Sequence, residues 1–540
     1  PLGQGLANAV GMALTERWLN AHFGDSIVDH KTYVFCGDGC LMEGISHEAA
    51  SLAGHLGLGR IVVLYDDNRI TIDGATDLSF SEDVGARFVS YGWHVQHCDG
   101  HDTEAIAAAI EAANAVTDKP SIVCCRTNIG QGSPNLAGSA KTHGSPLGDE
   151  EIRATKTALD MDPDALFAVP ADVVAWVRER DGERAATRAS WEARLSDHPD
   201  RERWTQFMSP PDVDSVPIAS FEPGKIATRK ASHKVLQQLA AGLGNLVGGS
   251  ADLAGSNGSM LNGFDALAQQ TPGGRNVFYG IREHAMAAMC NGMTLHGGLL
   301  PYCATFLTFH DYMRPSVRLA GLMKQPVVFV YTHDSIHVGE DGPTHQPVEH
   351  IQSMRAMINL WVFRPADANE TVEAWRAALA RRDGPTAMCL TRQGLPIVDR
   401  TAGLGAASGT QRGGYVLAKA SGGVPDLVLV ATGSEVSLAM EARDVLEAQG
   451  TATRVVSMPC VELFDSQDAD YRGTVLPAGI PRVVVEAGIT FGWDRIAGPG
   501  GGIVGIDRYG ASAPGPVVAD KLGMNVDNVV RTAQDVLARA

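Results

Sequence analysis

The stretch TYVFCGDG at residues 32–39 joins a short apolar run to a Gly-Asp-Gly turn. In the same way, RIVVLYDDN at residues 60–68 runs from apolar residues into Asp-Asp-Asn. Continuous apolar runs rich in Val and Ile are typical of strands that are buried on both faces of a parallel sheet. The pattern recurs at residues 121–125, 326–331, 426–431 and 481–485.

Helical patterns alternate with these runs. Residues 103–116 and 434–447 each begin with polar residues and continue into an Ala- and Leu-rich body. Alternation of this kind predicts an α/β fold in which helices cover parallel sheets. Ligands of such sheets bind just beyond the carboxyl ends of the strands, so the motifs that directly follow the apolar runs carry the most information.

Two stretches interrupt the alternation. Residues 162–223 are rich in charged residues and end in a Pro- and Asp-rich segment, which predicts peripheral helices and then a linker. Residues 399–413 are rich in Gly, Ala and Ser. We therefore expect three consecutive α/β domains with parallel or mixed sheets, at 1–195, 223–398 and 412–540, with a linker at 196–222.

The composition excludes some partners. The 540 residues carry a formal charge of −18, which argues against non-specific binding of nucleic acid. No apolar run approaches membrane-spanning length. An anionic substrate is compatible with this charge, because a few Arg and His side chains can hold a phosphate. Nine cysteines without a CxxC pair indicate reduced thiols in a cytoplasmic protein.

The two motifs after the first strands point to a metal ion. Gly-Asp-Gly alone is an ordinary turn, but here Asp38 is paired with Asn68, and each follows a strand. Carboxylate and amide oxygens suit Mg²⁺ or Ca²⁺ bridging a diphosphate, and glycines allow the backbone to approach it closely. The pair resembles the cofactor signature of thiamine-diphosphate enzymes. That resemblance implies that Asp38, Asn68 and the backbone carbonyl of Ile70 ligate the metal.

A second motif, YGIREHAM at residues 279–286, places Glu283 at the expected start of a helix. A lone acid there is explained by the helix dipole. Thiamine chemistry, however, requires one carboxyl group beside the aminopyrimidine ring, and Arg-Glu in this setting is similar to those enzymes. The resemblance implies that Glu283 is catalytic.

Aromatic residues follow at a spacing of three: Phe306, Phe309 and Tyr312. A helical stripe of this kind is more often part of a core. The resemblance implies instead that these rings pack around the aminopyrimidine.

A polar loop, THDSIHVGEDGPTHQP at residues 332–347, follows another predicted strand. It could be a polar surface loop or a metal cluster, although no pair has the usual ligand spacing. So many donors and acceptors at a strand end also suit a polyhydroxylated ligand.

This loop resembles the transketolase family in particular. GGSADLAGSN at 248–257, DGCLMEGISHE at 38–48 and VVSMP at 455–459 resemble it as well, and the likeness runs along the whole chain. It implies transfer of a two-carbon ketol unit from a ketose phosphate such as xylulose 5-phosphate to an aldose phosphate, in the pentose phosphate pathway. It also implies thiamine diphosphate, Mg²⁺ (with Ca²⁺ or Mn²⁺ as substitutes) and a homodimer with active sites at the subunit interface.

The same resemblance implies a role for each matching residue. The substrate phosphate would be held by Arg229, Ser256, His333 and Arg392. The sugar hydroxyls and proton transfer would fall to His143, Asp341 and His345. Cofactor binding would add Gly39, Glu43, Asp252 and again His143.

Departures from the family keep alternatives open. The chain begins at Pro1 in a Gly-rich segment, whereas the family carries further active-site histidines ahead of this point, so we expect a truncated first domain. An inactive or complementing fragment, a formaldehyde transketolase and a thiamine enzyme of other chemistry are the alternatives. His337 stands where many relatives have a small residue. Residues 412–540 offer no catalytic candidate and are expected to support a dimer.

Overall fold

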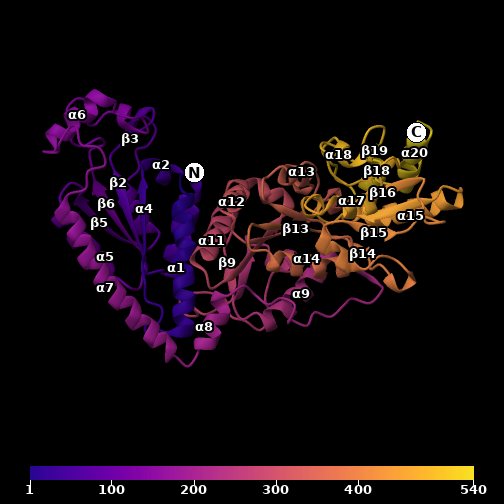
Figure 1. The fold of residues 1–540 in the computed structure, drawn as a ribbon, viewed down its shortest axis with the longest axis horizontal. Helices are drawn as coiled ribbons and strands as arrows, with labels where there is room; N and C mark the ends of the chain where they lie inside the picture. Colours follow the sequence, from indigo (N-terminus) through magenta and orange to yellow (C-terminus); the bar gives the residue numbers. More distant parts are fainter. Residues whose placement is uncertain (540) are drawn as a thin grey trace. The chain divides into compact units, whose positions relative to one another are not determined.

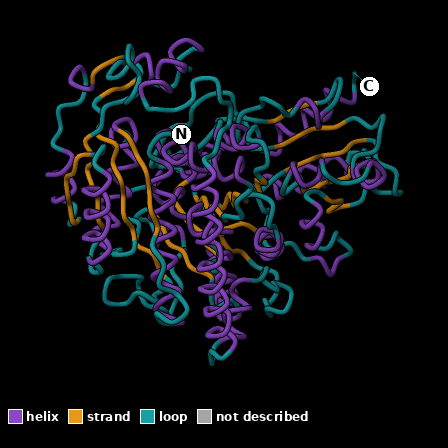
Figure 2. Tube along the Cα trace, turned by 60° about the vertical axis from the view of Figure 1, so that its left-hand side comes forward, coloured by secondary structure: helices purple, strands orange, loops and turns teal. Residues whose placement is uncertain are grey.

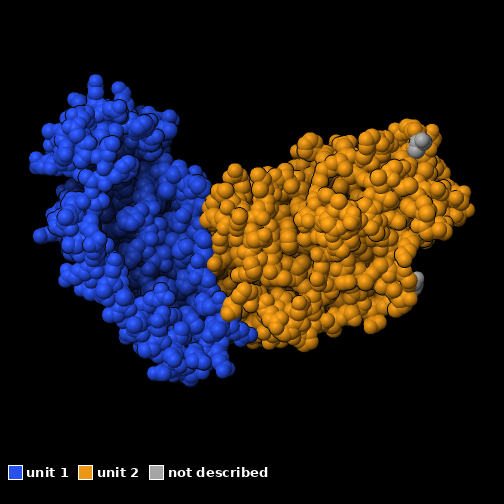
Figure 3. All heavy atoms as spheres, viewed as in Figure 1, with its two compact units in different colours: residues 1–208, 267–274, 295–298 blue, residues 209–266, 275–294, 299–540 orange. Residues whose placement is uncertain are grey.

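The computed structural model describes residues 1–539, apart from the side chain of Ala402. They form two compact units, shown in blue and orange in Figure 3. Unit 1 comprises Pro1–Met208, Leu267–Gly274 and Leu295–Gly298. Unit 2 comprises Ser209–Ala266, Arg275–Thr294 and Leu299–Ala540. In both units helices surround the strands (Figure 2). None of the helices in the described part of the chain is long and apolar enough to cross a membrane.

Unit 1 contains a parallel sheet in the order β1-β2-β6-β5 (Figure 1). Its strands are β1 (Thr32–Gly37), β2 (Ile61–Asp67), β5 (His94–Asp99) and β6 (Ser121–Arg126), with a small hairpin of β3 (Ile70–Thr71) and β4 (Gly74–Ala75). Its helices are α1 (Gln4–Phe23), α2 (Asp38–Met42), α3 (Gly44–Leu56), α4 (Val84–Ser90), α5 (Thr103–Ala115), α6 (Asp149–Ala158), α7 (Ala171–Ser196) and α8 (Arg201–Met208).

One expectation about this sheet is wrong. Strand β1 was expected to be buried on both faces, but Tyr33 is 46% and Phe35 80% exposed, whereas Val34 and Cys36 are buried. The reason is its position: β1 is the edge strand of the sheet, and helix α1 packs against it. Strands β2 and β6 lie inside the sheet, and their apolar residues are buried as predicted.

The charged stretch of unit 1 forms peripheral helices, as its composition indicates. Helix α7 has no buried residue. It is attached through Trp191, whose indole Nε1 donates to the carbonyl of Ile27 at 2.8 Å. In helix α8, Trp204 packs edge-on against Phe23 with the ring centroids 5.1 Å apart. Aromatic anchors therefore hold an otherwise solvated segment on the first unit.

Unit 2 begins with a six-stranded sheet in the order β12-β13-β11-β10-β8-β9, in which all pairs are parallel. Its strands are β8 (Leu246–Ser250), β9 (Asn276–Phe278), β10 (Leu300–Phe306), β11 (Val328–Thr332), β12 (Trp361–Phe363) and β13 (Thr386–Leu390). Strands β7 (Lys225–Ala227) and β14 (Gly394–Pro396) form a separate antiparallel pair. The helices are α9 (Thr228–Gly242), α10 (Ala254–Asn257), α11 (Glu283–His296), α12 (His310–Met323), α13 (His350–Arg355) and α14 (Ala368–Ala380).

A second sheet of unit 2 has the order β15-β17-β16-β18-β19 and is mixed, because β15 pairs antiparallel with β17. Its strands are β15 (Tyr415–Ala418), β16 (Leu427–Ala431), β17 (Thr453–Ser457), β18 (Arg482–Val485) and β19 (Gly502–Val504). The helices are α15 (Glu435–Ala448), α16 (Val461–Asp465), α17 (Ala469–Val475), α18 (Asp494–Ala497), α19 (Gly515–Lys521) and α20 (Val526–Leu537). The predicted α/β class with parallel and mixed sheets is confirmed, and the proposed domain limits stay a prediction.

Candidate active site

The first candidate group lies where β1 and β2 end side by side. In the parallel register Gly37 pairs with Asp66, which brings the two sequence motifs together. Asp38 begins helix α2 and is only 3% exposed. Its Oδ1 accepts from the hydroxyl of Tyr65 at 2.6 Å, and its Oδ2 accepts from the backbone N–H of Arg69 at 3.1 Å. Burial raises the pKa of Asp38, and the Tyr65 hydrogen bond opposes this in part.

Asn68 is fixed by its own neighbours. Its Oδ1 accepts from the backbone N–H of Ile70 at 2.9 Å, and its Nδ2 donates to Oδ2 of Asp66 at 2.8 Å. Asp66 also accepts from the hydroxyl of Thr127. Sequence reasoning missed the orienting roles of Tyr65 and Asp66, although both stand within the quoted RIVVLYDDN stretch.

The oxygen atoms of Asp38 and Asn68 suit a divalent cation. Asp38 lines a cavity of about 530 Å³ together with Tyr65, Asp67 and Arg69. A buried carboxylate that neutral groups hold in place, and an amide oxygen two residues after Asp66 at the neighbouring strand end, are the oxygen ligands that Mg²⁺ prefers. A bound cation would also offset the burial that raises the pKa of Asp38.

Of the other predicted residues in unit 1, Gly39 is half-buried in α2, Glu43 is exposed between α2 and α3, and His143 is exposed after the turn Ala140–Thr142.

In unit 2, Glu283 is the first residue of helix α11, as predicted. Its side chain is buried, and this burial raises the pKa of the carboxyl group. A raised pKa favours the protonated carboxyl group, which can donate a hydrogen bond to a ring nitrogen, whereas a carboxylate cannot. The environment of Glu283 therefore suits the role that its sequence motif implied.

The aromatic residues do not form one helical stripe, which corrects that expectation. Phe306 ends strand β10, Phe309 ends the 3₁₀ turn Leu307–Phe309, and Tyr312 lies in helix α12. The rings still form a row: Phe306 and Phe309 are stacked with centroids 5.8 Å apart, and Tyr312 follows at 6.0 Å. Tyr312 is 64% exposed, so the row is open at one end and is available to a flat ligand.

A cluster of basic side chains lies beside this row. His333 is buried with its ring centroid 3.8 Å from that of Phe306, and His345 packs against Phe309 at 5.6 Å. Burial lowers the pKa of His333 to about 3, and the positive charges of Arg229 and Arg392 reinforce the effect. We call Arg229, His333, His345 and Arg392 the basic cluster.

The basic cluster has unused donors. Arg229 donates through Nη1 to the carbonyl of Ser256, while its buried Nε has no hydrogen-bond partner among the described residues. Burial, reinforced by Arg392, lowers the pKa of Arg229. Like charges gathered around an unused donor suit an anion, and a guanidinium is well shaped to hold a phosphate. The remaining predicted residues, Asp252 and Asp341, are exposed in loops of the same unit.

Comparison with known proteins shows which family the chain belongs to. Family models match residues 1–206 (transketolase, thiamine diphosphate binding domain), 224–398 (transketolase, pyrimidine binding domain) and 413–525 (transketolase-like C-terminal domain). The transketolase of Cereibacter sphaeroides is 50% identical over 99% of this chain and 81% of its own length. Transketolase 1 of Escherichia coli is 47% identical over 99% of this chain and 83% of its own.

Solved structures give the same result. The transketolase of Leishmania mexicana matches with a TM-score of 0.94 at 42% identity, over 100% of this chain and 81% of that one. A Pichia stipitis transketolase, solved in complex with xylulose 5-phosphate, matches with a TM-score of 0.95 at 40% identity. The match covers 100% of this chain and 81% of that one. The chain belongs to the transketolase family of thiamine-diphosphate-dependent ketol transferases.

Proposed function

We propose that this ketol transferase takes its two-carbon unit from a ketose phosphate such as xylulose 5-phosphate. The acceptor would be an aldose phosphate, either ribose 5-phosphate or erythrose 4-phosphate, as in the pentose phosphate pathway. The observation that carries the proposal is the basic cluster, in which Arg229 has a buried unused donor beside His333. Transketolase from Pichia stipitis was solved in two structures, one with xylulose 5-phosphate and one with sedoheptulose 7-phosphate, which supports sugar phosphates as the ligand class.

Thiamine diphosphate, when bound, supplies a nucleophilic carbon and an electron sink for cleaving a carbon–carbon bond. In this proposal Asp38, Asn68 and the carbonyl of Ile70 hold Mg²⁺, with Ca²⁺ or Mn²⁺ as substitutes. The cofactor itself would be held by Gly39, Glu43, His143, Asp252, Phe306, Phe309 and Tyr312. Glu283 would share its proton with a nitrogen of the aminopyrimidine ring, which its raised pKa favours.

The substrate would be oriented by three kinds of contact. Arg229, Ser256, His333 and Arg392 would bind the phosphate. Asp341 would accept a hydrogen bond from the C2 hydroxyl of the aldose phosphate acceptor, which fixes the stereochemistry that the site accepts. His345 and His143 would exchange protons with the hydroxyl groups nearest the bond that breaks, because a neutral imidazole can both accept and donate.

We further propose a cytoplasmic homodimer with each active site at the subunit interface. Large apolar side chains close to Glu283 in sequence are open to solvent: Phe278 is 58% and Ile281 76% exposed. Exposed apolar groups of this size favour a covering surface. Sedimentation equilibrium of the chain with cofactor and Mg²⁺ tests this part of the proposal, and a monomer under turnover conditions would contradict it.

The experiment for the function itself is an assay with thiamine diphosphate, Mg²⁺, xylulose 5-phosphate and ribose 5-phosphate. A coupled reaction follows the released glyceraldehyde 3-phosphate. Turnover that requires both the cofactor and the acceptor supports the proposal. Replacing ribose 5-phosphate with formaldehyde tests the alternative acceptor. No turnover with ribose 5-phosphate and none with formaldehyde would contradict the proposed activity.

A further inference from the structure

The strand order of the second sheet of unit 2 reverses at β16, and we call the region at the carboxyl ends of β16 and β18 the crevice. The chain first adds β17 on one side of β16 and then returns to add β18 and β19 on the other. In open α/β sheets, ligands bind at such a reversal, outside the carboxyl ends of the strands. Here Thr432 and Ser434 follow β16, and Glu486 follows β18.

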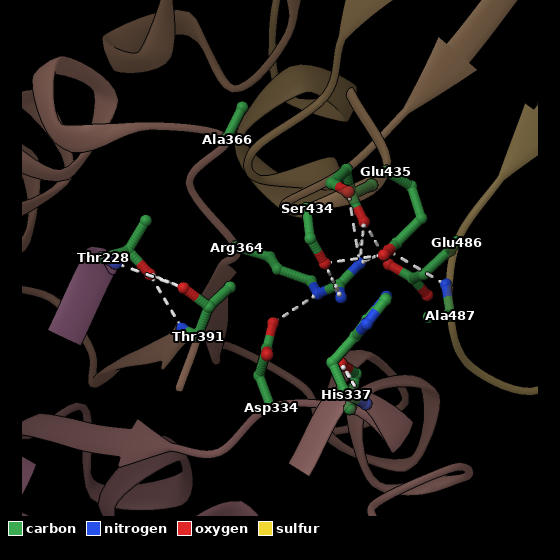
Figure 4. Close-up of polar contacts among 12 residues, drawn as sticks. Thr228, Asp334, His337, Arg364, Ala366, Thr391, Ser434, Glu435, Glu486 and Ala487 are labelled. Carbon is green, nitrogen blue, oxygen red and sulfur yellow. Dashed lines mark hydrogen bonds and ion pairs between the residues drawn. The ribbon is translucent and has the colours of Figure 1, made fainter. Parts of the chain in front are cut away.

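Side chains from the preceding sheet fill this crevice. Arg364, which directly follows β12, has no exposed surface. Its Nη1 donates to the carbonyl and hydroxyl oxygens of Thr432 at 3.1 and 3.0 Å, and its Nη2 donates to Oγ of Ser434 at 3.2 Å. Arg364 also forms an ion pair with the carboxylate of Glu435. Figure 4 shows Ser434 and Glu435 beside the guanidinium of Arg364.

A second arginine occupies the same crevice. Arg355 donates from Nη1 and Nη2 to the two carboxylate oxygens of Glu486, both at 2.8 Å. Glu486 also accepts from the hydroxyl of Thr432 at 2.5 Å. The crevice is therefore occupied by the protein itself: Glu435 is paired with Arg364, and Glu486 with Arg355, the last residue of helix α13.

The remaining edge of the Arg364 guanidinium reaches toward the proposed substrate loop. Its Nε donates to Oδ2 of Asp334 at 2.9 Å, and Asp334 is buried (Figure 4). Buried charges are stable only when they are paired, so this contact leaves Asp334 little freedom to move. Asp334 is also the residue that follows His333 of the basic cluster.

The backbone of His333 needs this support. Its φ of 61° lies in the left-handed region, where a residue other than glycine persists only if its surroundings determine it. On one side, Thr332 accepts a hydrogen bond from Nδ2 of Asn257 at 2.8 Å. On the other side, the Asp334 and Arg364 pair provides the anchor.

The far end of the loop is held by the same domain. Gln346 donates from Nε2 to the carbonyl of Gly339 at 2.7 Å and to that of Ala511 at 3.0 Å. Residue 511 follows β19, the last strand of the second sheet. Both ends of the loop from His333 to Gln346 are therefore fixed by residues around this sheet.

The geometry assigns Arg364 as a positioning residue: the C-terminal sheet uses the crevice to clamp Arg364, which holds Asp334 and thereby His333 in the basic cluster. This assignment rests on the proposed role of the basic cluster in phosphate binding. It gives residues 412–540 a part in substrate recognition besides the expected support of a dimer.

The test compares a phosphorylated donor with the same sugar lacking the phosphate. Asp334→Asn keeps the shape and an acceptor oxygen but removes the charge that pairs with Arg364. We expect KM for xylulose 5-phosphate to rise about tenfold, as for small displacements of a binding group. For xylulose, kcat/KM should change less than about twofold, because that donor carries no phosphate for the basic cluster to bind.

Arg355→Lys is the matched control, since it disturbs the same crevice without touching Asp334. It should lower the melting temperature and leave the ratio of KM for xylulose 5-phosphate to KM for xylulose unchanged. Ser434→Ala removes one contact of Arg364 and should shift the ratio in the same direction as Asp334→Asn, by less, so the test survives if the latter fails to fold.

Equal losses with both donors, or an unchanged ratio in Asp334→Asn and Ser434→Ala, would overturn the assignment. A wild-type chain that does not prefer xylulose 5-phosphate over xylulose would instead contradict the proposed function. The two failures are therefore distinguishable.

Discussion

The hydroxyl of Tyr65 donates to Oδ1 of Asp38 over 2.6 Å, at the point where two neighbouring parallel strands end. This contact orients a buried carboxylate that the proposed Mg²⁺ site requires. Groups that orient a metal ligand usually affect metal affinity about 10- to 100-fold. Tyr65 is therefore a sensitive position, although it contacts neither metal nor substrate in the proposal.

We predict that Tyr65→Phe weakens Mg²⁺ binding about tenfold in the presence of thiamine diphosphate, because Asp38 loses its orienting donor. Calorimetric titration with Mg²⁺ measures the change. Tyr33→Phe is the matched control, since the Tyr33 hydroxyl donates to Asn114 at 2.9 Å on the exposed part of β1. Equal affinity in wild type and Tyr65→Phe would show that the contact does not orient the ligand.

Glu16 should make the stability of the protein depend on pH. Burial raises its pKa to about 7 from a usual value of 4.5, against partial opposition from Arg60. Between these values the folded state binds more protons than the unfolded state, so stability falls as the pH rises through this window. Above about pH 7 Glu16 is charged and buried, and the free energy of unfolding stays at its lower value.

Glu16→Gln removes this titration. Its melting temperature should exceed that of the wild type at about pH 8 and match it at about pH 5. Glu104→Gln, which changes an exposed acid in the first turn of α5, should show no such difference. Parallel melting curves of wild type and Glu16→Gln across this range would mean that Glu16 is ionised in the folded protein.

The cysteines should report on the core. All nine are free thiols; seven are buried, and only Cys40 and Cys98 are partly open. We predict that a thiol reagent modifies at most these two rapidly under native conditions and all nine after denaturation. Mass spectrometry of labelled peptides identifies the sites. Rapid labelling of Cys303 or Cys389, which are fully buried in β10 and β13, would contradict the packing of unit 2.

Sequence analysis identified strand ends that local patterns determine. Asp38 and Asn68 each follow an apolar run, and parallel pairing of adjacent strands is enough to bring them together. The exposure of Phe35 was not predictable, because strand order decides which strand lies at an edge. The aromatic row was misread as one helix, since a spacing of three does not reveal a strand end followed by a turn.

The Arg364 contacts were beyond sequence reasoning for a different reason. Its partners lie 30 residues before it, at Asp334, and 68 to 71 residues after it, from Thr432 to Glu435. No periodicity relates such positions. His337, which stood out in the sequence without an explanation, points toward the same cluster in Figure 4. The structure thus gives that residue a location, while its effect stays untested.

The account depends most on Glu283, and one measurement tests it directly. Turnover of xylulose 5-phosphate and ribose 5-phosphate is compared between wild type and Glu283→Gln at saturating cofactor, with Glu104→Gln as the control. Loss of a positioned acid should lower kcat about 10²- to 10⁴-fold, while the control keeps wild-type activity. A Glu283→Gln variant with kcat within about twofold of wild type would contradict the assignment of Glu283 as the catalytic acid.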